Sequence, residues 1–371
     1  MPAKQNKIIR IPIQKNLCWN KNRPILKLNQ YGDFTRFYQG SCPINVHNIA
    51  GQYIGYGLYN HSEQLLIHLS DHAGNLKDIC AERLKQAVKA RESIFTLPCY
   101  RLIHHFHDRL PHVIIDRYNN IYCIRTFCAA SDLLIPFLSD CLTNDFNAEA
   151  VLLKNTFHKR QVKGLITSDQ ILAGGLKDNI IPVYENDFTF FYDTKANLDP
   201  FPCYMRPLRL ELNSSMQNSK TRGNMLFIGI APEITISEQT KCHTDQIQHI
   251  IIKDRFLSEI TDQLRRLEQQ RKEFDAIVFN HPVLTATDKN KTALFHLYYH
   301  LLKLTHDASK IYLQIFDWKV LKQIWQHCAH KQNIALTFTI LEAQNTLQDH
   351  YGSLPDHAKQ TGYSVLIEVK K

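Results

Sequence analysis

The chain has 371 residues, which is enough for two or three domains, and its 44% of apolar residues can build hydrophobic cores. The low numbers of glycines (13) and prolines (14) argue against extensive disorder. The formal net charge of +9 favours an anionic partner, either nucleic acid or an acidic surface. No apolar run approaches the length of a membrane span, so we expect a soluble protein without a membrane partner.

The ten cysteines are dispersed, and no pair has the spacing of a zinc site or a redox motif. This usage fits a reducing cytosol, so we expect a cytoplasmic protein without a bound metal. The segment before Asp33 carries basic but no acidic residues, as an organellar presequence would. However, residues 8–13 alternate like a β-strand, which favours a place in the first domain.

Residues 7–72 contain short strand patterns and little helix. Glycines in residues 51–60 provide tight turns, and residues 65–70 alternate like a half-buried strand. A small β-barrel over residues 1–75 is the simplest prediction. Residues 81–91 have apolar side chains at helical spacing, which predicts a helix joining this barrel to the next domain.

Residues 76–198 are predicted to form an α+β domain. Asn119 and Asn120 are typical of a hairpin turn between two strands. A helix is expected at residues 132–141, and strands are expected at residues 100–106, 112–118, 120–127, 150–155 and 188–193.

This middle region interleaves aromatic and basic side chains, the latter being Arg101, Arg117, Arg125, Lys154, Lys159 and Arg160. Such a mixture is typical of surfaces that bind single-stranded RNA. An ordinary sheet with core aromatics and surface arginines is an equally good interpretation. Under the RNA hypothesis, charge reversal at Arg101 and Arg117 should weaken RNA binding.

From about residue 200 strand and helix patterns alternate. Nearly continuous apolar runs, which suit parallel strands covered on both faces, occur at residues 224–230, 249–254, 274–280 and 310–316. Amphipathic helices are expected at residues 258–272 and 291–306, and a closing antiparallel pair at residues 334–340 and 363–369. The pattern predicts a doubly wound, Rossmann-like α/β domain over residues 199–371.

Several short motifs occur together in this order. The middle region contains Tyr100-Arg101-Leu102, Leu110-Pro111 and Asp116-Arg117-Tyr118, and the last domain contains Asn280-His281-Pro282 after a strand. In these motifs, and over nearly its whole length, the chain resembles the bacterial large-subunit ribosomal RNA cytosine-C5 methyltransferase I family.

The resemblance implies an N-terminal PUA domain, a central α+β domain and a C-terminal class I methyltransferase domain. It also implies S-adenosylmethionine as cofactor, ribosomal RNA as partner, cytoplasmic location and a homodimer. Where the family places glycines and a glutamate in the middle region, this chain has His105, Phe106, Arg109 and His112.

The resemblance implies that Gly229, Asp254 and Asn280 bind the methyl donor. Gly229 is the one glycine of a turn where the family has several, and Pro232 removes an amide donor. The short distance between this turn and Asn280 suggests that the strand carrying the ribose-binding acid is deleted, while Asp254 resembles the adenine-side acid. A solvated aspartate at a strand end is the alternative. We therefore expect impaired cofactor binding.

Cytosine C5 methylation needs a cysteine thiolate that attacks the base. The family places this cysteine just after the strand corresponding to residues 310–316, where this chain has Asp317-Trp318-Lys319. Cys328 lies on the following helix and is expected to be a buried packing thiol. The catalytic residue is therefore unknown.

Before the last domain, residues 200–209 retain Arg206 and Arg209 of a family motif, but Tyr204 replaces its aspartate. Two arginines three residues apart would clamp a phosphate, or they would form a solvated helix start.

These observations predict an RNA-binding protein on a methyltransferase scaffold with reduced or lost catalysis, that is, a pseudoenzyme. An active S-adenosylmethionine-dependent RNA methyltransferase with a non-standard site is the first alternative. A non-catalytic scaffold that binds protein partners is the second.

Overall fold

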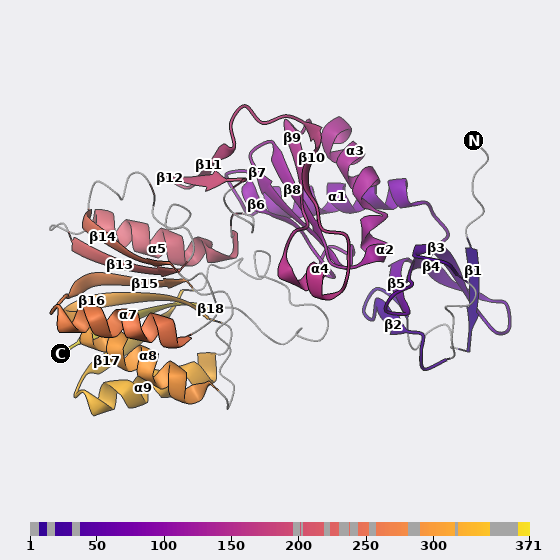
Figure 1. Cartoon of the computed structure of the whole chain (residues 1–371). Coiled ribbons are helices and arrows are strands. Elements are labelled where there is room, and N and C mark those ends of the chain that lie inside the picture. Colours follow the sequence, from indigo (N-terminus) through magenta and orange to yellow (C-terminus); the bar gives the residue numbers. More distant parts are fainter. Residues whose placement is uncertain are drawn as a thin grey trace. The chain divides into compact units, whose positions relative to one another are not determined.

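The computed structural model describes residues 7–12, 19–31, 38–195, 201, 203–218, 223–229, 237, 244–251, 257–280, 290–315, 318–341 and 363–371 (Figure 1). The chain divides into two compact units. The first contains residues 1–179 and 194–200, and the second contains residues 180–193 and 201–371. The division into three domains stays a prediction.

The first unit begins with a five-stranded sheet whose order is β1-β3-β4-β5-β2. β1 runs parallel to β3 and the other neighbours are antiparallel. The strand predicted at residues 8–13 is confirmed as β1, although a PUA-like barrel stays a prediction. The strands are β1 (Lys7–Ile11), β2 (Ile25–Lys27), β3 (Cys42–Asn48), β4 (Tyr53–Asn60) and β5 (Leu65–Ser70).

Gly57 allows β4 and β5 to approach closely beside a buried tryptophan. A Cβ atom at Gly57 would overlap the carbonyl oxygen of Ile67 and lie 3.0 Å from the Trp19 ring. Trp19 is 1% exposed and its indole N–H donates to the carbonyl of Leu66 at 3.2 Å. The glycine is therefore needed for space rather than for turn formation.

A second sheet of the first unit has the order β10-β9-β8-β7-β6. All its neighbours are antiparallel except β8 and β9. Asn119, with φ of 56°, lies in the hairpin between β7 and β8, as the sequence predicts. The strands are β6 (Cys99–His104), β7 (Val113–Tyr118), β8 (Ile121–Thr126), β9 (Ala150–Lys154) and β10 (Asp169–Gly174).

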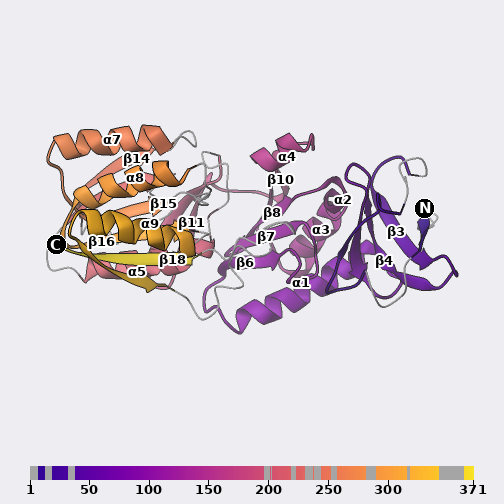
Figure 2. The same ribbon diagram turned by 90° about the horizontal axis from the view of Figure 1, so that it is seen from below.

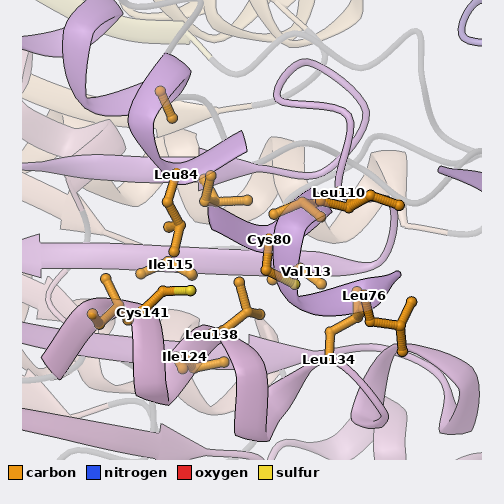
Figure 3. Close-up of a cluster of buried hydrophobic side chains, with 14 of the residues drawn as sticks. Leu76, Cys80, Leu84, Leu110, Val113, Ile115, Ile124, Leu134, Leu138 and Cys141 are labelled. Atoms are coloured by element: carbon orange, nitrogen blue, oxygen red, sulfur yellow. The ribbon is translucent and has the colours of Figure 1, made fainter. Parts of the chain in front are cut away.

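Helices α1 (Leu76–Glu92) and α3 (Ile135–Asp145) pack against this sheet, and Figure 3 shows their shared core of leucine, isoleucine, valine and cysteine side chains. The Asn75 side chain caps α1 by accepting from the amide of Asp78. The single helix predicted at residues 132–141 is instead two helices, because α2 (Ala129–Asp132) ends before α3 begins at Ile135 with Pro136 in its first turn. A short helix, α4 (His158–Val162), follows β9.

The second unit begins with a hairpin of β11 (Ile180–Glu185) and β12 (Phe188–Asp193). The sequence pattern assigned residues 188–193 to the middle module. In the structure, they pair with β11 in a separate two-stranded sheet that belongs to the second unit.

The main sheet of the second unit has the order β14-β13-β15-β16-β18-β17. The first four strands are parallel, whereas β18 is antiparallel to both β16 and β17. The predictions of parallel strands and of a closing antiparallel pair are therefore confirmed. The strands are β13 (Gly223–Gly229), β14 (Thr244–Ile251), β15 (Phe274–Asn280), β16 (Thr305–Ile315), β17 (Ala335–Ile340) and β18 (Tyr363–Lys370).

Helices cover both faces of this sheet (Figures 1 and 2). On β13, Met225 and Phe227 pack with α5 (Arg206–Gln217), which follows a 3-10 turn at Cys203–Met205. Leu226 and Ile228 face the opposite core. That core contains α7 (Leu257–Gln269), α8 (Lys291–Lys303) and α9 (Trp318–Lys331). Because successive side chains point to opposite covered faces, residues 225–228 of the strand are all apolar.

Within the described part of the chain, no helix has the length and apolarity needed to cross a membrane.

Candidate functional site

The carboxyl ends of β13 and β15 meet at the point where the order of the parallel strands reverses. β14 lies on one side of β13 and β15 on the other. In an open α/β sheet, ligands bind in the crevice outside the strands at such a switch point. Gly229, the last residue of β13, is in register with Asn280, the last residue of β15. The structure thus brings two of the three predicted cofactor residues together.

His249 on β14 contacts the same strand end and was not identified from the sequence. Its Nε2 lies 3.3 Å from the carbonyl oxygen of Gly229, and its ring meets the Phe227 ring edge-on at 5.2 Å. This contact orients the carbonyl that ends β13. In the sequence, His249 is recognisable only as a polar residue at the start of an apolar run, and this pattern does not indicate that it contacts Gly229.

The third predicted cofactor residue, Asp254, lies outside the described residues. The strand that leads towards it, β14, pairs directly with β13, and Gly229 is in register with Ile251. The expectation of a deleted strand next to β13 is wrong, because β14 fills that place.

Cys328 on α9 has the surroundings of a packing thiol. It belongs to the core beneath the sheet, and its Sγ donates to the carbonyl of Phe295 at 3.4 Å. Burial raises the pKa of Cys328 to about 12. The thiolate is the nucleophilic form of cysteine, so this side chain is inert near neutral pH.

Arg206 and Arg209 form a buried ion-pair cluster with Glu185 rather than a phosphate clamp or a solvated helix start. Arg209 and Glu185 are both fully buried, and the guanidinium donates to the two carboxylate oxygens at 2.8 and 2.5 Å. Arg206 donates to the same carboxylate at 3.3 Å. Arg209 also lies 4.2 Å from the centroid of the Phe201 ring. The cluster joins hairpin β11–β12 to α5, so these arginines serve the fold.

Arg101, predicted to face RNA, is 1% exposed. Its guanidinium donates to the carboxylate of Asp116 at 2.8 and 3.3 Å, and Arg125 adds a contact of 3.4 Å to the same buried carboxylate. The structure revises the assignment of Arg101, because a guanidinium that is buried and paired within a sheet does not reach a ligand. Charge reversal at this position would place two carboxylates together.

Arg117 has the most exposed side chain of the four arginines assigned to RNA, at 14%. It donates to the hydroxyl of Tyr100 at 2.7 Å and to the carbonyl of Asn119 at 2.9 Å. Its guanidinium lies 5.6 Å from the ring centroids of both Tyr100 and Tyr122. Both rings are buried, which agrees with the interpretation of core aromatics.

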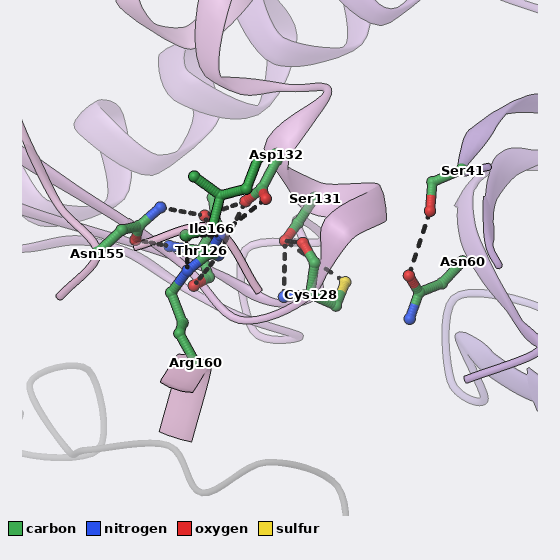
Figure 4. Close-up of polar contacts among 9 residues, drawn as sticks. All are labelled: Ser41, Asn60, Thr126, Cys128, Ser131, Asp132, Asn155, Arg160 and Ile166. Atoms are coloured by element: carbon green, nitrogen blue, oxygen red, sulfur yellow. Dashed lines mark hydrogen bonds and ion pairs between the residues drawn. The ribbon is translucent and has the colours of Figure 1, made fainter. Parts of the chain in front are cut away.

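A further buried network ties α4 to the sheet, and Figure 4 shows its contacts. Arg160, 1% exposed, donates to both carboxylate oxygens of Asp132 at 2.9 and 2.8 Å and to the carbonyl of Thr126 at 3.0 Å. Asn155 completes the network through two hydrogen bonds to Thr126. Lys154 is likewise buried and paired with Asp169 at 2.5 Å. Four of the basic residues of the predicted RNA surface are therefore internal, namely Arg101, Arg125, Lys154 and Arg160.

The parallel strands, their helices on both faces and the switch point define the class of the second unit as Rossmann-like α/β. No protein family model matches the chain. Among solved structures, "A putative sam-dependent methyltransferase from Streptococcus mutans" is similar over 98% of this chain and 100% of its own, with a TM-score of 0.67 and 12% identity. SMU.776, described as a putative methyltransferase complexed with SAH, has a TM-score of 0.64 at 12% identity and the same coverage. The chain therefore has the fold of these methyltransferases.

A comparison with curated protein sequences also identifies a methyltransferase. Ribosomal RNA large subunit methyltransferase I of Shewanella amazonensis is 24% identical over 151 residues, which are 39% of this chain and 38% of the relative. The match thus spans well under half the length of that protein. The chain thus resembles the large-subunit ribosomal RNA methyltransferase I family, as its sequence motifs indicate.

Proposed function

We propose that this chain is an RNA-binding protein on an S-adenosylmethionine-dependent methyltransferase scaffold, in which cysteine-dependent methyl transfer is reduced or lost. The state of Cys328 carries this proposal. The one thiol in the segment after β16 is buried, bonded to a carbonyl and raised in pKa to about 12, and attack on cytosine requires a thiolate. The resemblance to a ribosomal RNA methyltransferase and the net charge of +9 support RNA, proposed to be ribosomal, as the partner.

An active methyltransferase with a non-standard site is the second candidate, and the strand ends at the switch point favour it. Gly229 has no side chain to block a ligand, and Asn280 lies beside it. Asp254 follows the strand next to β13, so we assign it to the ribose side of a bound donor rather than to the adenine side. These residues fit S-adenosylmethionine, which when bound supplies an electrophilic methyl group. His249 would hold the Gly229 carbonyl in place.

Calorimetric titration with S-adenosylhomocysteine separates the two candidates. Lost function predicts no saturable heat and no transfer of labelled methyl groups to RNA. Saturable binding that Asn280→Ala weakens, together with methyl transfer, would favour the enzyme and contradict the proposal. A matched Asn224→Ala variant, at the opposite end of β13 from the switch point, should leave any binding unchanged.

A gel-retardation assay with structured RNA tests whether the chain binds RNA or is instead a scaffold that binds only protein partners. We expect a complex whose affinity falls steeply as the salt concentration rises, because phosphate contacts release counterions. Arg117→Glu should weaken it, since this arginine retains surface. A wild-type protein that binds no RNA at low salt would favour the scaffold that binds protein partners.

A further inference from the structure

The first unit contains a cavity of about 250 Å³ that lies outside the residues assigned above. Its walls come from the segment of Lys21, the end of β5, the middle of α1, and the loop between β6 and β7. The charged and aromatic side chains of the lining are those of Lys21, Asp71, Glu82, Arg83, Phe106 and Arg109. This volume lies near the lower end of small-molecule pockets, about 300 Å³, and suits one small ligand.

The charges of this lining leave cations available for an anion. The lining holds three cations, Lys21, Arg83 and Arg109, against the two carboxylates of Asp71 and Glu82, and burial lowers the pKa of the neighbouring His68, which disfavours its charged form. Among the described residues, neither Lys21 nor Arg109 takes part in an ion pair. An anion in the cavity would therefore complete the charge balance.

Arg83 is a buried cation in the wall of the cavity. It is 8% exposed, and its Nε is buried without a hydrogen-bond partner. Its terminal nitrogens donate to Glu82, Gln86 and the carbonyl of Leu69. Burial lowers the pKa of Arg83, and the nearby Arg109 contributes in the same direction. The repulsion between these two guanidinium groups favours an anion near them.

The loop between β6 and β7 is held in the shape that brings an aromatic ring and Arg109 to the cavity. Arg109 has φ of 55°, in a region that non-glycine residues seldom adopt. Asp108 fixes the loop by accepting from Arg91 at 2.5 and 2.7 Å and from the amide of His104 at 2.6 Å. Unusual backbone held by buried ion pairs is typical of binding sites.

We propose that this cavity binds a nucleotide, with its phosphate among Lys21, Arg83 and Arg109 and its base against Phe106. Arginine forks and lysine match phosphate, and a base stacks on an aromatic ring whatever its sequence. The inference rests on the proposed function insofar as a strand of RNA supplies the nucleotide. A free nucleotide offers the same chemistry.

The test is anisotropy of a short fluorescein-labelled oligouridylate at several salt concentrations. Lys21→Gln with Arg109→Gln should weaken binding at least tenfold and reduce the salt slope by about 0.7, the contribution of one phosphate on a single strand. Phe106→Ala should weaken binding about fivefold or more without changing the slope, because stacking carries no charge. The matched control, Lys89→Gln with Lys177→Gln, removes the same charge from exposed residues outside the cavity.

If wild-type protein binds the oligonucleotide and the cavity variants bind as the control does, the cavity proposal fails and the RNA-binding proposal stands. If wild-type protein binds no oligonucleotide, calorimetry with uridine monophosphate decides. Saturable heat that disappears in the cavity double variant and persists in the control would establish a free-nucleotide site. No heat from the wild type would overturn the inference. Circular dichroism and thermal melts establish that each variant is folded.

Discussion

Asp116 is the centre of a buried ion pair in the first unit. It is fully buried and accepts hydrogen bonds from Arg101 and Arg125, which are 1% and 3% exposed. The sequence placed Asp116 in a motif shared with the methyltransferase family, and the structure shows that two arginines within the sheet share its one negative charge. The motif at this position therefore serves stability.

Asp116→Asn should destabilise the first unit by about 3–5 kcal/mol, because removing one partner leaves buried guanidinium charge uncompensated. Urea denaturation followed by circular dichroism measures this loss. Asp145→Asn makes the same chemical change at a partly exposed carboxylate 3.9 Å from Lys85, and it should cost no more than about 0.5 kcal/mol. Equal effects of the two substitutions would show that burial of the pair is unimportant.

His112 makes the stability of the first unit depend on pH. It is 3% exposed, and burial, assisted by Lys163 and opposed by Glu63, lowers its pKa to about 4. An unfolded histidine has a pKa near 6.5, so the unfolded chain binds the extra proton first. The stabilisation is complete above about pH 6.5 and is lost as the pH falls towards 4.

His112→Asn should remove this dependence while keeping the backbone, because φ of 63° suits asparagine. Between pH 7 and pH 5 the free energy of unfolding should fall about 2 kcal/mol further for the wild type than for the variant. Denaturation at the two pH values measures the difference. His68 and His104 also have lowered pKa values, so the variant retains part of the acid sensitivity. Parallel pH profiles would refute the assignment to His112.

Hairpin β11–β12 is attached to α5 by one carboxylate. Glu185 on β11 is fully buried and accepts from both Arg206 and Arg209 of the helix. The sequence predicted strand 188–193 correctly but not its partner sheet. Strand propensity depends on local residues, whereas the location of the hairpin depends on an ion pair between residues more than twenty positions apart.

Glu185→Gln should destabilise the second unit by about 3–5 kcal/mol, since it removes the negative charge that Arg206 and Arg209 share. Asp187→Asn, an exposed change of equal charge in the same hairpin, should leave stability within about 0.5 kcal/mol. Guanidinium denaturation followed by fluorescence measures both effects. An unaltered transition in the Glu185 variant would mean that the hairpin is not held by this pair.

The two units have separate hydrophobic cores. Of the four clusters of buried apolar residues described, two draw only on the first unit and two only on the second. Proteins with several cores often depart from two-state unfolding. The residue and element substitutions above therefore act on different parts of the molecule.

Equilibrium unfolding should show two transitions. Trp325 lies in the core of the second unit and Trp19 in that of the first. In a Trp19→Phe background, fluorescence should follow the second unit, while far-ultraviolet circular dichroism follows both. Asp116→Asn should shift one transition and Glu185→Gln the other. A single transition that both substitutions move equally would show that the chain unfolds as one cooperative unit.

The sequence by itself determined the alternation of strands and helices after about residue 200, the parallel character of the central strands there and the resemblance to a methyltransferase family. These features follow from apolar periodicity and local motifs, which are readable along the chain. Only the tertiary structure decided that Arg101, Arg206 and Arg209 are internal, that β14 lies beside β13, and that cations surround a cavity near Phe106. The sequence does not show whether a charged side chain is solvated or is paired with a carboxylate from a distant part of the chain. Its role therefore depends on the partner that the fold brings to it.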